Sequence, residues 1–103
     1  MPTLDPQDTQ HPLYAISVAG ELTGVDPQML RIYETRGLLN PVRTGGGTRR
    51  YSGRDIERIG RITMFLAAGL NLAGIAQVFA LEAETERLRQ EIERLRDVDQ
   101  ADP

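Results

Sequence analysis

Two short segments near the start of the chain carry apolar residues at the spacing of an α-helix. In the first, "YAISVAGELTG", Val18, Ala19 and Leu22 fall on one face, and Ser17 is the predicted N-cap. Gly24 is the predicted stop, because a glycine readily takes the left-handed conformation that closes a helix. The pattern therefore predicts a first helix of roughly two turns.

The second segment, "DPQMLRIYETRG", opens with Asp26 as N-cap before a proline at the first helical position, and Gly37 is its predicted stop. Leu30, Tyr33 and Glu34 share one side of this helix. Two short helices joined by "TGV" have the spacing of a helix-turn-helix, whose second helix enters the major groove of DNA. The same spacing also fits an ordinary pair of packed helices, so both interpretations stay open at this point.

Two extended stretches, "LLNPVRT" and "TRRYS", follow on either side of three glycines and predict a β-hairpin. The glycines let the turn lie close to a phosphate backbone, where a Cβ atom would clash. Because neighbouring residues of a strand point to opposite faces, only one of Arg49 and Arg50 can face DNA squarely, and Arg43 on the partner strand can add to that face. We expect Tyr51 to be a core residue under the hairpin.

A third helix is predicted from Ser52, its N-cap, and a fourth over residues 72–96, capped by Asn71 after the break "AAGLN". The fourth helix extends past the compact domain and carries a narrow heptad stripe among glutamates and arginines, which favours self-association in a short coiled coil over packing on its own domain. The predicted dimerisation residues are Val78, Leu81, Thr85, Leu88, Ile92 and Leu95.

The net charge of −3 is unevenly distributed. Residues 11–66 hold eight arginines against five carboxylates, whereas residues 67–103 hold four arginines against eight carboxylates. A basic body between acidic ends is compatible with nucleic-acid binding through the body. An arginine-rich face that is simply solvated would have the same composition.

Several classes of function are disfavoured by composition. The chain has no cysteine, and its single histidine, His11, has no partner histidine, so we expect no metal site, no disulfide and no cofactor. No catalytic set of side chains is recognisable, so we do not expect an enzyme. The sequence has neither a membrane-spanning apolar run nor a signal pattern, which predicts a cytoplasmic protein.

The predicted fold is mainly α: a winged helix-turn-helix with a two-stranded wing and a C-terminal coiled-coil helix. We expect an N-terminal arm over residues 1–13 that is disordered or at most extended. A DNA-binding domain over residues 14–81 follows, and then a dimerisation helix with a short tail over residues 82–103.

The stretch "ISVAGELTGVDPQMLRIYETRGLLNPVRTGGGTRRYSGRDIERI" resembles the DNA-binding domain of the MerR superfamily of bacterial transcription regulators, over roughly residues 14–81. Within that superfamily, "GGGTRRYS" followed by "GLNLAGI" is most similar to the HspR branch of heat-shock repressors. The resemblance implies a homodimer, held by an antiparallel coiled coil, that binds an inverted repeat in double-stranded DNA. Most superfamily members carry an effector domain after the coiled coil. This chain ends at Pro103, so we expect no site for a drug or metal co-inducer.

By this resemblance, Arg31 and Tyr33 match positions that meet DNA from the recognition helix, and Arg50 matches the wing arginine. Gln28 and Met29 stand where the family reads bases, although the Met29 side chain cannot donate a hydrogen bond. The full predicted DNA-binding set is Ser17, Gln28, Met29, Arg31, Tyr33, Arg36, Arg43, Thr48, Arg49, Arg50 and Tyr51.

The function implied is a dimeric repressor of heat-shock or chaperone genes in the bacterial cytoplasm, associated with the nucleoid, and the DnaK chaperone is a further partner that the resemblance suggests. One alternative is a MerR-like regulator of another regulon. Another is a small chaperone modulator that binds a DnaJ-type co-chaperone instead of DNA. The presence of Arg31, Tyr33, Arg49 and Arg50 argues against the modulator, which lacks the basic contact set.

Overall fold

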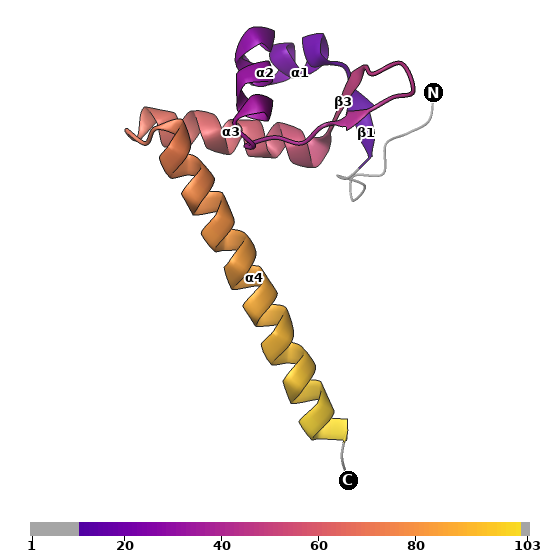
Figure 1. The fold of residues 1–103 in the computed structure, drawn as a ribbon, viewed down its shortest axis with the longest axis vertical. Coiled ribbons are helices and arrows are strands. Elements are labelled where there is room, and N and C mark those ends of the chain that lie inside the picture. The colour runs from indigo at the N-terminus through magenta and orange to yellow at the C-terminus, as the bar shows by residue number, and fades with distance from the viewer. Residues whose placement is uncertain (1–10, 102–103) are drawn as a thin grey trace.

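The computed structural model describes residues 11–101, and the predicted mainly helical architecture is present in it (Figure 1). A small body holds three short helices and a small sheet, and one long helix projects away from this body (Figure 1). The elements are β1 (Pro12–Tyr14), α1 (Ile16–Thr23), α2 (Pro27–Thr35), β2 (Val42–Arg43), β3 (Arg49–Ser52), α3 (Gly53–Ala67) and α4 (Leu72–Ala101).

The predicted start signals of α2, α3 and α4 are confirmed. The Asp26 side chain accepts a hydrogen bond of 2.7 Å from the backbone N–H of Gln28, with a proline at the start of α2. Ser52 and Asp55 form a reciprocal capping box at the start of α3. The side-chain oxygen of Asn71 accepts a 2.7 Å hydrogen bond from the backbone N–H of Gly74. Side-chain oxygens therefore satisfy N–H groups at each of these helix starts.

The start of α1 differs from the prediction. Its N-cap is Ala15 in an extended conformation without a side-chain hydrogen bond, and Ser17 lies inside the helix with an exposed side chain. The helix begins at Ile16, only two residues after the end of β1, and therefore starts before Ser17. The predicted stop at Gly24 is confirmed, since it takes the left-handed conformation with φ 74°.

Gly20 explains how α1 approaches the start of α2. A Cβ atom at this position would lie 3.0 Å from the carbonyl oxygen of Val25 and 3.4 Å from Cγ of Pro27. The missing side chain therefore allows close packing of the turn that joins the two helices.

The sheet has the order β1–β3–β2, and both strand pairs are antiparallel. The predicted hairpin is present as β2 and β3, where Val42 lies opposite Arg50 and Arg43 lies opposite Arg49. The pairing of β1 with β3 was not predicted. Pro12 and Leu13 were assigned to an arm that is disordered or at most extended, and both lie in the extended strand β1. The rest of the predicted arm, residues 1–10, lies outside the described residues.

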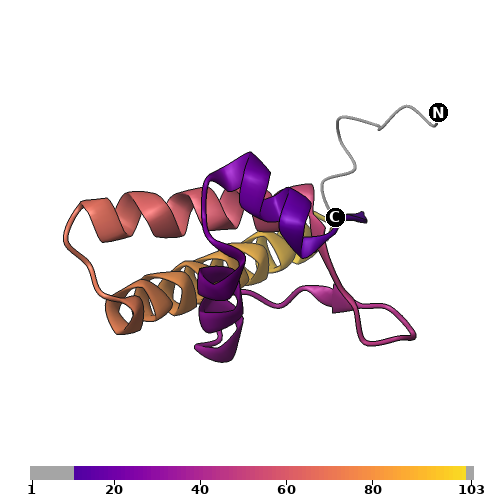
Figure 2. The ribbon, with the colours of Figure 1, turned by 90° about the horizontal axis from the view of Figure 1, so that it is seen from above.

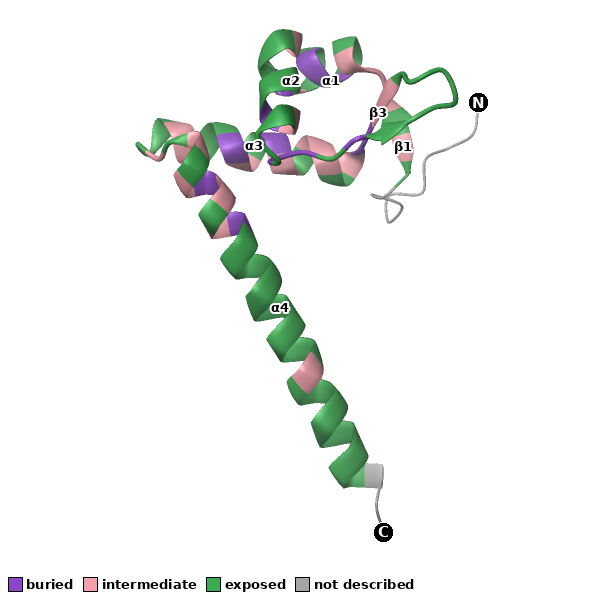
Figure 3. Cartoon of the chain, in the orientation of Figure 1, coloured by how far each residue is buried: buried purple, intermediate pink, exposed green. Residues whose placement is uncertain are grey.

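The core lies between α1, α2, α3, β3 and the first turns of α4. It consists of Ala19, Leu30, Tyr33, Leu38, Leu39, Tyr51, Ile59, Ile62, Ile75 and Phe79. Figure 3 shows that burial is confined to the body and to the beginning of α4, and that the remaining length of α4 is largely exposed. The apolar side chains of the body therefore pack against one another, whereas most of α4 does not take part in this core.

The long helix α4 ends at Ala101, five residues beyond the predicted end of the helix. Its heptad stripe is exposed beyond the body: the accessible fraction is 64% for Leu81, 47% for Leu88, 48% for Ile92 and 51% for Leu95. The alternative in which this stripe packs on its own domain is therefore not observed. Figure 2 shows the hairpin loop at the opposite end of the body from the turn between α3 and α4.

Candidate nucleic-acid interface

The outer face of α2 carries exposed side chains along its whole length. Gln28, Met29, Arg31 and Arg36 of the predicted DNA-binding set are all exposed, while Leu30 faces the core. The Arg31 guanidinium donates a 3.3 Å hydrogen bond to the Gln28 side-chain oxygen on this face. A short helix with one buried side and one exposed side that carries polar groups has the form needed to enter a major groove.

Two tyrosines of the predicted DNA-binding set are not on the surface. Tyr33 is 2% exposed and Tyr51 is fully buried, and burial raises the pKa of both hydroxyls. Tyr33 shares the apolar side of α2 with Leu30, and its DNA contact stays a prediction. Tyr51 was also expected to be a core residue under the hairpin, and that expectation is confirmed.

Glu34 joins the wing to the recognition helix. One carboxylate oxygen accepts a 2.6 Å hydrogen bond from the Arg43 guanidinium, and the other accepts one from Nε of Arg49. Burial on its own raises the pKa of Glu34, but the hydrogen bonds from Arg49 and Arg43 outweigh it and leave the pKa lowered. The same hydrogen bond raises the pKa of Arg49. Neither arginine is therefore a free cation.

Sequence reasoning did not identify this role of Glu34. The only local signal was that Glu34 shares the inner side of the helix with Leu30 and Tyr33, an unusual place for a carboxylate without a partner. Its partners lie 9 and 15 residues further along the chain and meet it only once the hairpin has formed.

Arg50 differs from its two neighbours in the wing. It is half-buried, and within residues 11–101 its guanidinium makes no hydrogen bond and no ion pair. Arg43 lies directly opposite Arg49 and shares its acidic partner, whereas Arg50 lies opposite Val42. Thr48 at the end of the loop and Ser17 on α1 are exposed. Arg50 is thus the wing cation that is available for a phosphate.

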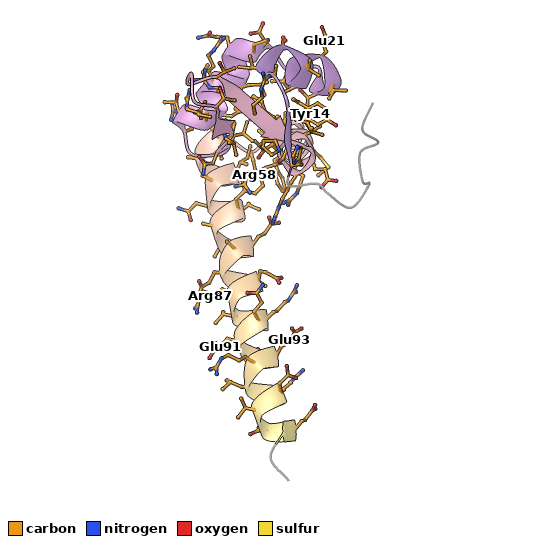
Figure 4. The ribbon with its side chains drawn as sticks, turned by 90° about the vertical axis from the view of Figure 1, so that its right-hand side faces the viewer. Tyr14, Glu21, Arg58, Arg87, Glu91 and Glu93 are labelled. Atoms are coloured by element: carbon orange, nitrogen blue, oxygen red, sulfur yellow. The ribbon has the colours of Figure 1, made fainter. Side chains whose placement is uncertain are left out.

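A second set of contacts fixes α4 to the body. The Arg58 guanidinium lies 3.9 Å from the ring centroid of Phe79, and its Nε donates a 2.7 Å hydrogen bond to the carbonyl oxygen of Leu38. Arg61 binds both carboxylate oxygens of Glu82, at 2.8 and 2.6 Å. Figure 4 labels Arg58 at the base of the body, where α4 begins. Arg58 therefore connects the loop that follows the recognition helix to the long helix.

Within residues 11–101 there is no group of three or more histidine or acidic side chains that could hold a metal ion. No helix in this part of the chain is both long and apolar enough to cross a membrane.

A helix pair with an antiparallel hairpin beside it is a winged helix-turn-helix, as predicted. Residues 14–82 match the family of MerR HTH regulatory proteins, and the chain belongs to this family. Its members are transcription regulators and not enzymes, so the prediction that the protein is not an enzyme is confirmed.

A Streptomyces coelicolor protein with the provisional name heat shock protein HspR is 46% identical over 79 residues, which are 76% of this chain and 52% of that protein. This chain therefore spans about half the length of that relative.

Two solved structures share the fold. The N-terminal part of MtaN, the Bacillus subtilis multidrug transporter activator, has a TM-score of 0.59 at 30% identity, over 85% of this chain and 92% of that chain. HiNmlR is a MerR family regulator lacking the sensor domain and was solved bound to promoter DNA. It has a TM-score of 0.59 at 23% identity, over 81% of this chain and 75% of that chain. The second likeness concerns the fold alone.

Proposed function

We propose that the protein is a sequence-specific DNA-binding repressor of heat-shock or chaperone genes that acts as a homodimer on an inverted repeat. The observation that carries DNA binding is the exposed polar face of α2 beside a wing whose Arg50 has no partner within the described residues. The heat-shock regulon is supported by the likeness to the HspR protein over 79 residues. The protein would then act in the bacterial cytoplasm, where the nucleoid lies.

The dimer is supported by the exposed stripe of α4. Leu81, Leu88, Ile92 and Leu95 follow the heptad spacing, with Thr85 between the first two, and each of the four is between 47% and 64% exposed. Each buried leucine or isoleucine contributes roughly 1.5–3 kcal/mol, so pairing two copies removes a substantial apolar surface from water. Charged neighbours on both sides of the stripe keep the rest of the helix solvated.

An antiparallel pairing explains how two bodies can reach one DNA duplex. The seam from Val78 to Leu95 spans about 26 Å at 1.5 Å per residue. Antiparallel pairing places the two bodies at opposite ends of this seam, so that each recognition helix can enter its own major groove. Successive major grooves on one face of DNA are roughly 34 Å apart. The two-fold axis of the dimer requires an inverted repeat.

A gel shift followed by footprinting on the protein's own promoter and on chaperone-gene promoters tests this proposal. We expect protection of two symmetric half-sites that survives an excess of unrelated duplex, and we expect derepression of the chaperone genes when the gene is deleted. Protection of a single asymmetric half-site at saturation would contradict the dimeric model. Adding DnaK to the same gel shift tests the proposed chaperone partner, and a tighter or additional complex would support it.

Two alternatives predict other outcomes. A MerR-like regulator of another regulon, a multidrug transporter regulator for example, would protect its own promoter but leave chaperone promoters unbound; the likeness to MtaN favours this alternative. A chaperone modulator would bind a DnaJ-type co-chaperone and no duplex at all. The arginines of α2 and the wing favour DNA over the co-chaperone as the partner. The phosphates of DNA attract arginine whatever the base sequence.

A further inference from the structure

Glu34 stands at the junction of the two elements that the proposed function assigns to DNA. It lies in the last turns of α2, and its two oxygens are divided between β2 and β3, one to Arg43 and the other to Arg49. Arg43 also donates a 3.1 Å hydrogen bond to the carbonyl oxygen of Gly47 in the wing turn. A single carboxylate thus holds both strands of the hairpin and, through Arg43, its turn.

The strength of this contact follows from its surroundings. The Glu34 side chain is 18% exposed and that of Arg49 is 25% exposed, so water screens their ion pair less than it screens the pairs along α4. Hydrogen bonds between a guanidinium and a carboxylate are charge-assisted and stronger than neutral ones. Glu34 takes only part of the donors of each guanidinium, but its charge neutralises them, so a DNA phosphate competes with this carboxylate for both arginines.

We propose that Glu34 is a positioning residue that locks the wing onto the recognition helix and withholds Arg43 and Arg49 from DNA phosphates. This inference rests on the proposed DNA binding. Arg50 is then the wing cation that meets the backbone, and the lock fixes its position relative to the exposed face of α2. Phosphate contacts strengthen binding to every sequence equally, so withholding two arginines lowers non-specific affinity while the relative placement of helix and wing is kept.

The test is a salt titration of binding to a mixed-sequence duplex, with wild type, Glu34→Gln and Glu34→Asp. Glutamine removes the charge but keeps an oxygen that accepts hydrogen bonds, and aspartate keeps the charge but is too short to reach both strands. Glu21→Gln and Glu21→Asp are the matched controls, because Glu21 lies on the exposed side of α1 without a partner within the described residues (Figure 4). Circular dichroism confirms that each variant is folded.

We expect Glu34→Gln to steepen the slope of log affinity against log salt by about one to two, since each released arginine adds one phosphate contact. Each added contact changes affinity by about threefold between 200 and 50 mM salt. Glu34→Asp should steepen the slope by about one at unchanged net charge. Glu21→Gln should shift affinity without changing the slope, and Glu21→Asp should bind like wild type.

The outcomes separate the two proposals. Suppose that Glu34→Asp has the same salt slope as wild type and that Glu34→Gln has the same salt slope as Glu21→Gln. The arginines are then not withheld from phosphates, and this inference is overturned. If wild type binds no duplex even at low salt, DNA binding itself fails. A steeper slope for both Glu34 variants, together with a smaller preference for the operator over the mixed duplex, establishes the lock.

Discussion

The body and the projecting part of α4 use apolar residues in opposite ways. In the body, Ile59 and Ile62 of α3 are fully buried among side chains from other elements of the same chain. In α4 beyond Phe79, apolar residues are just as regularly spaced but remain exposed, as Leu81 and Leu95 show. The same helical periodicity thus signals a core where neighbouring elements follow within a few residues, and a partner surface where the helix extends past every other element.

The largest expected effect tests whether the exposed stripe serves a second copy. Leu88→Glu places a charge in the centre of the proposed seam, where pairing would bury it, so we expect a monomer in sedimentation and a loss of operator affinity of about 10²–10⁴-fold. Gln90→Glu adds the same charge two residues away, outside the seam, and should remain dimeric. A Leu88→Glu protein that still sediments as a dimer would refute the seam.

A second prediction compares one apolar residue from each region. Ile62→Ala removes a fully buried side chain and should lower the free energy of unfolding by about 2–5 kcal/mol. Leu81→Ala removes a side chain that is 64% exposed, so the unfolding free energy of the monomeric body should change little. Denaturant unfolding in the Leu88→Glu background measures both without a contribution from the dimer. Equal losses would mean that Leu81 packs within its own chain.

The part of the fold that could be predicted from sequence is the part determined by neighbours along the chain. Asp26, Ser52 and Asn71 cap helices through residues two or three positions away, so local pattern was sufficient to find them. The strand β1 was missed because its partner β3 lies about 40 residues further on, and nothing in "PLY" by itself favours a strand over a loop.

The candidate site shows the same division. The helical pattern places Tyr33 on the same side as Leu30, and this pattern predicts its burial in the core. The family resemblance predicts a DNA contact for the same residue. The exposed residues of α2 were predicted correctly as surface residues. The hydrogen bonds of Glu34 with Arg43 and Arg49 could not be predicted, because they depend on how the hairpin folds back onto α2 and not on any local spacing.

A third prediction distinguishes the cations of the body. Arg50→Ala should lower the salt slope of DNA binding by about one and weaken binding to all sequences, because one phosphate contact is lost. Arg54→Ala, at an exposed position in the first turn of α3, is the matched control and should have a smaller effect. Quantitative gel shifts between 50 and 200 mM salt measure both. An unchanged affinity of Arg50→Ala at low salt would remove Arg50 from the interface.

The smallest expected effect concerns the acid stability of the body. Because the pKa of Glu34 is lower in the folded protein than in the unfolded chain, its ionised form stabilises the fold at neutral pH. This contribution is complete above the ordinary glutamate pKa and is lost as the pH falls from about 5 through the lowered pKa of the folded state. We expect Glu34→Gln to melt at a lower temperature than wild type at pH 7, and the difference to shrink steadily as the pH falls below about 5. Glu21→Gln should melt like wild type at pH 7, because Glu21 makes no ion pair within residues 11–101. A charge-dependent contact must weaken when the carboxylate is protonated. A difference in melting temperature between Glu34→Gln and wild type that stays constant from pH 7 to pH 3 would therefore show that the ionised carboxylate does not stabilise the junction of wing and helix.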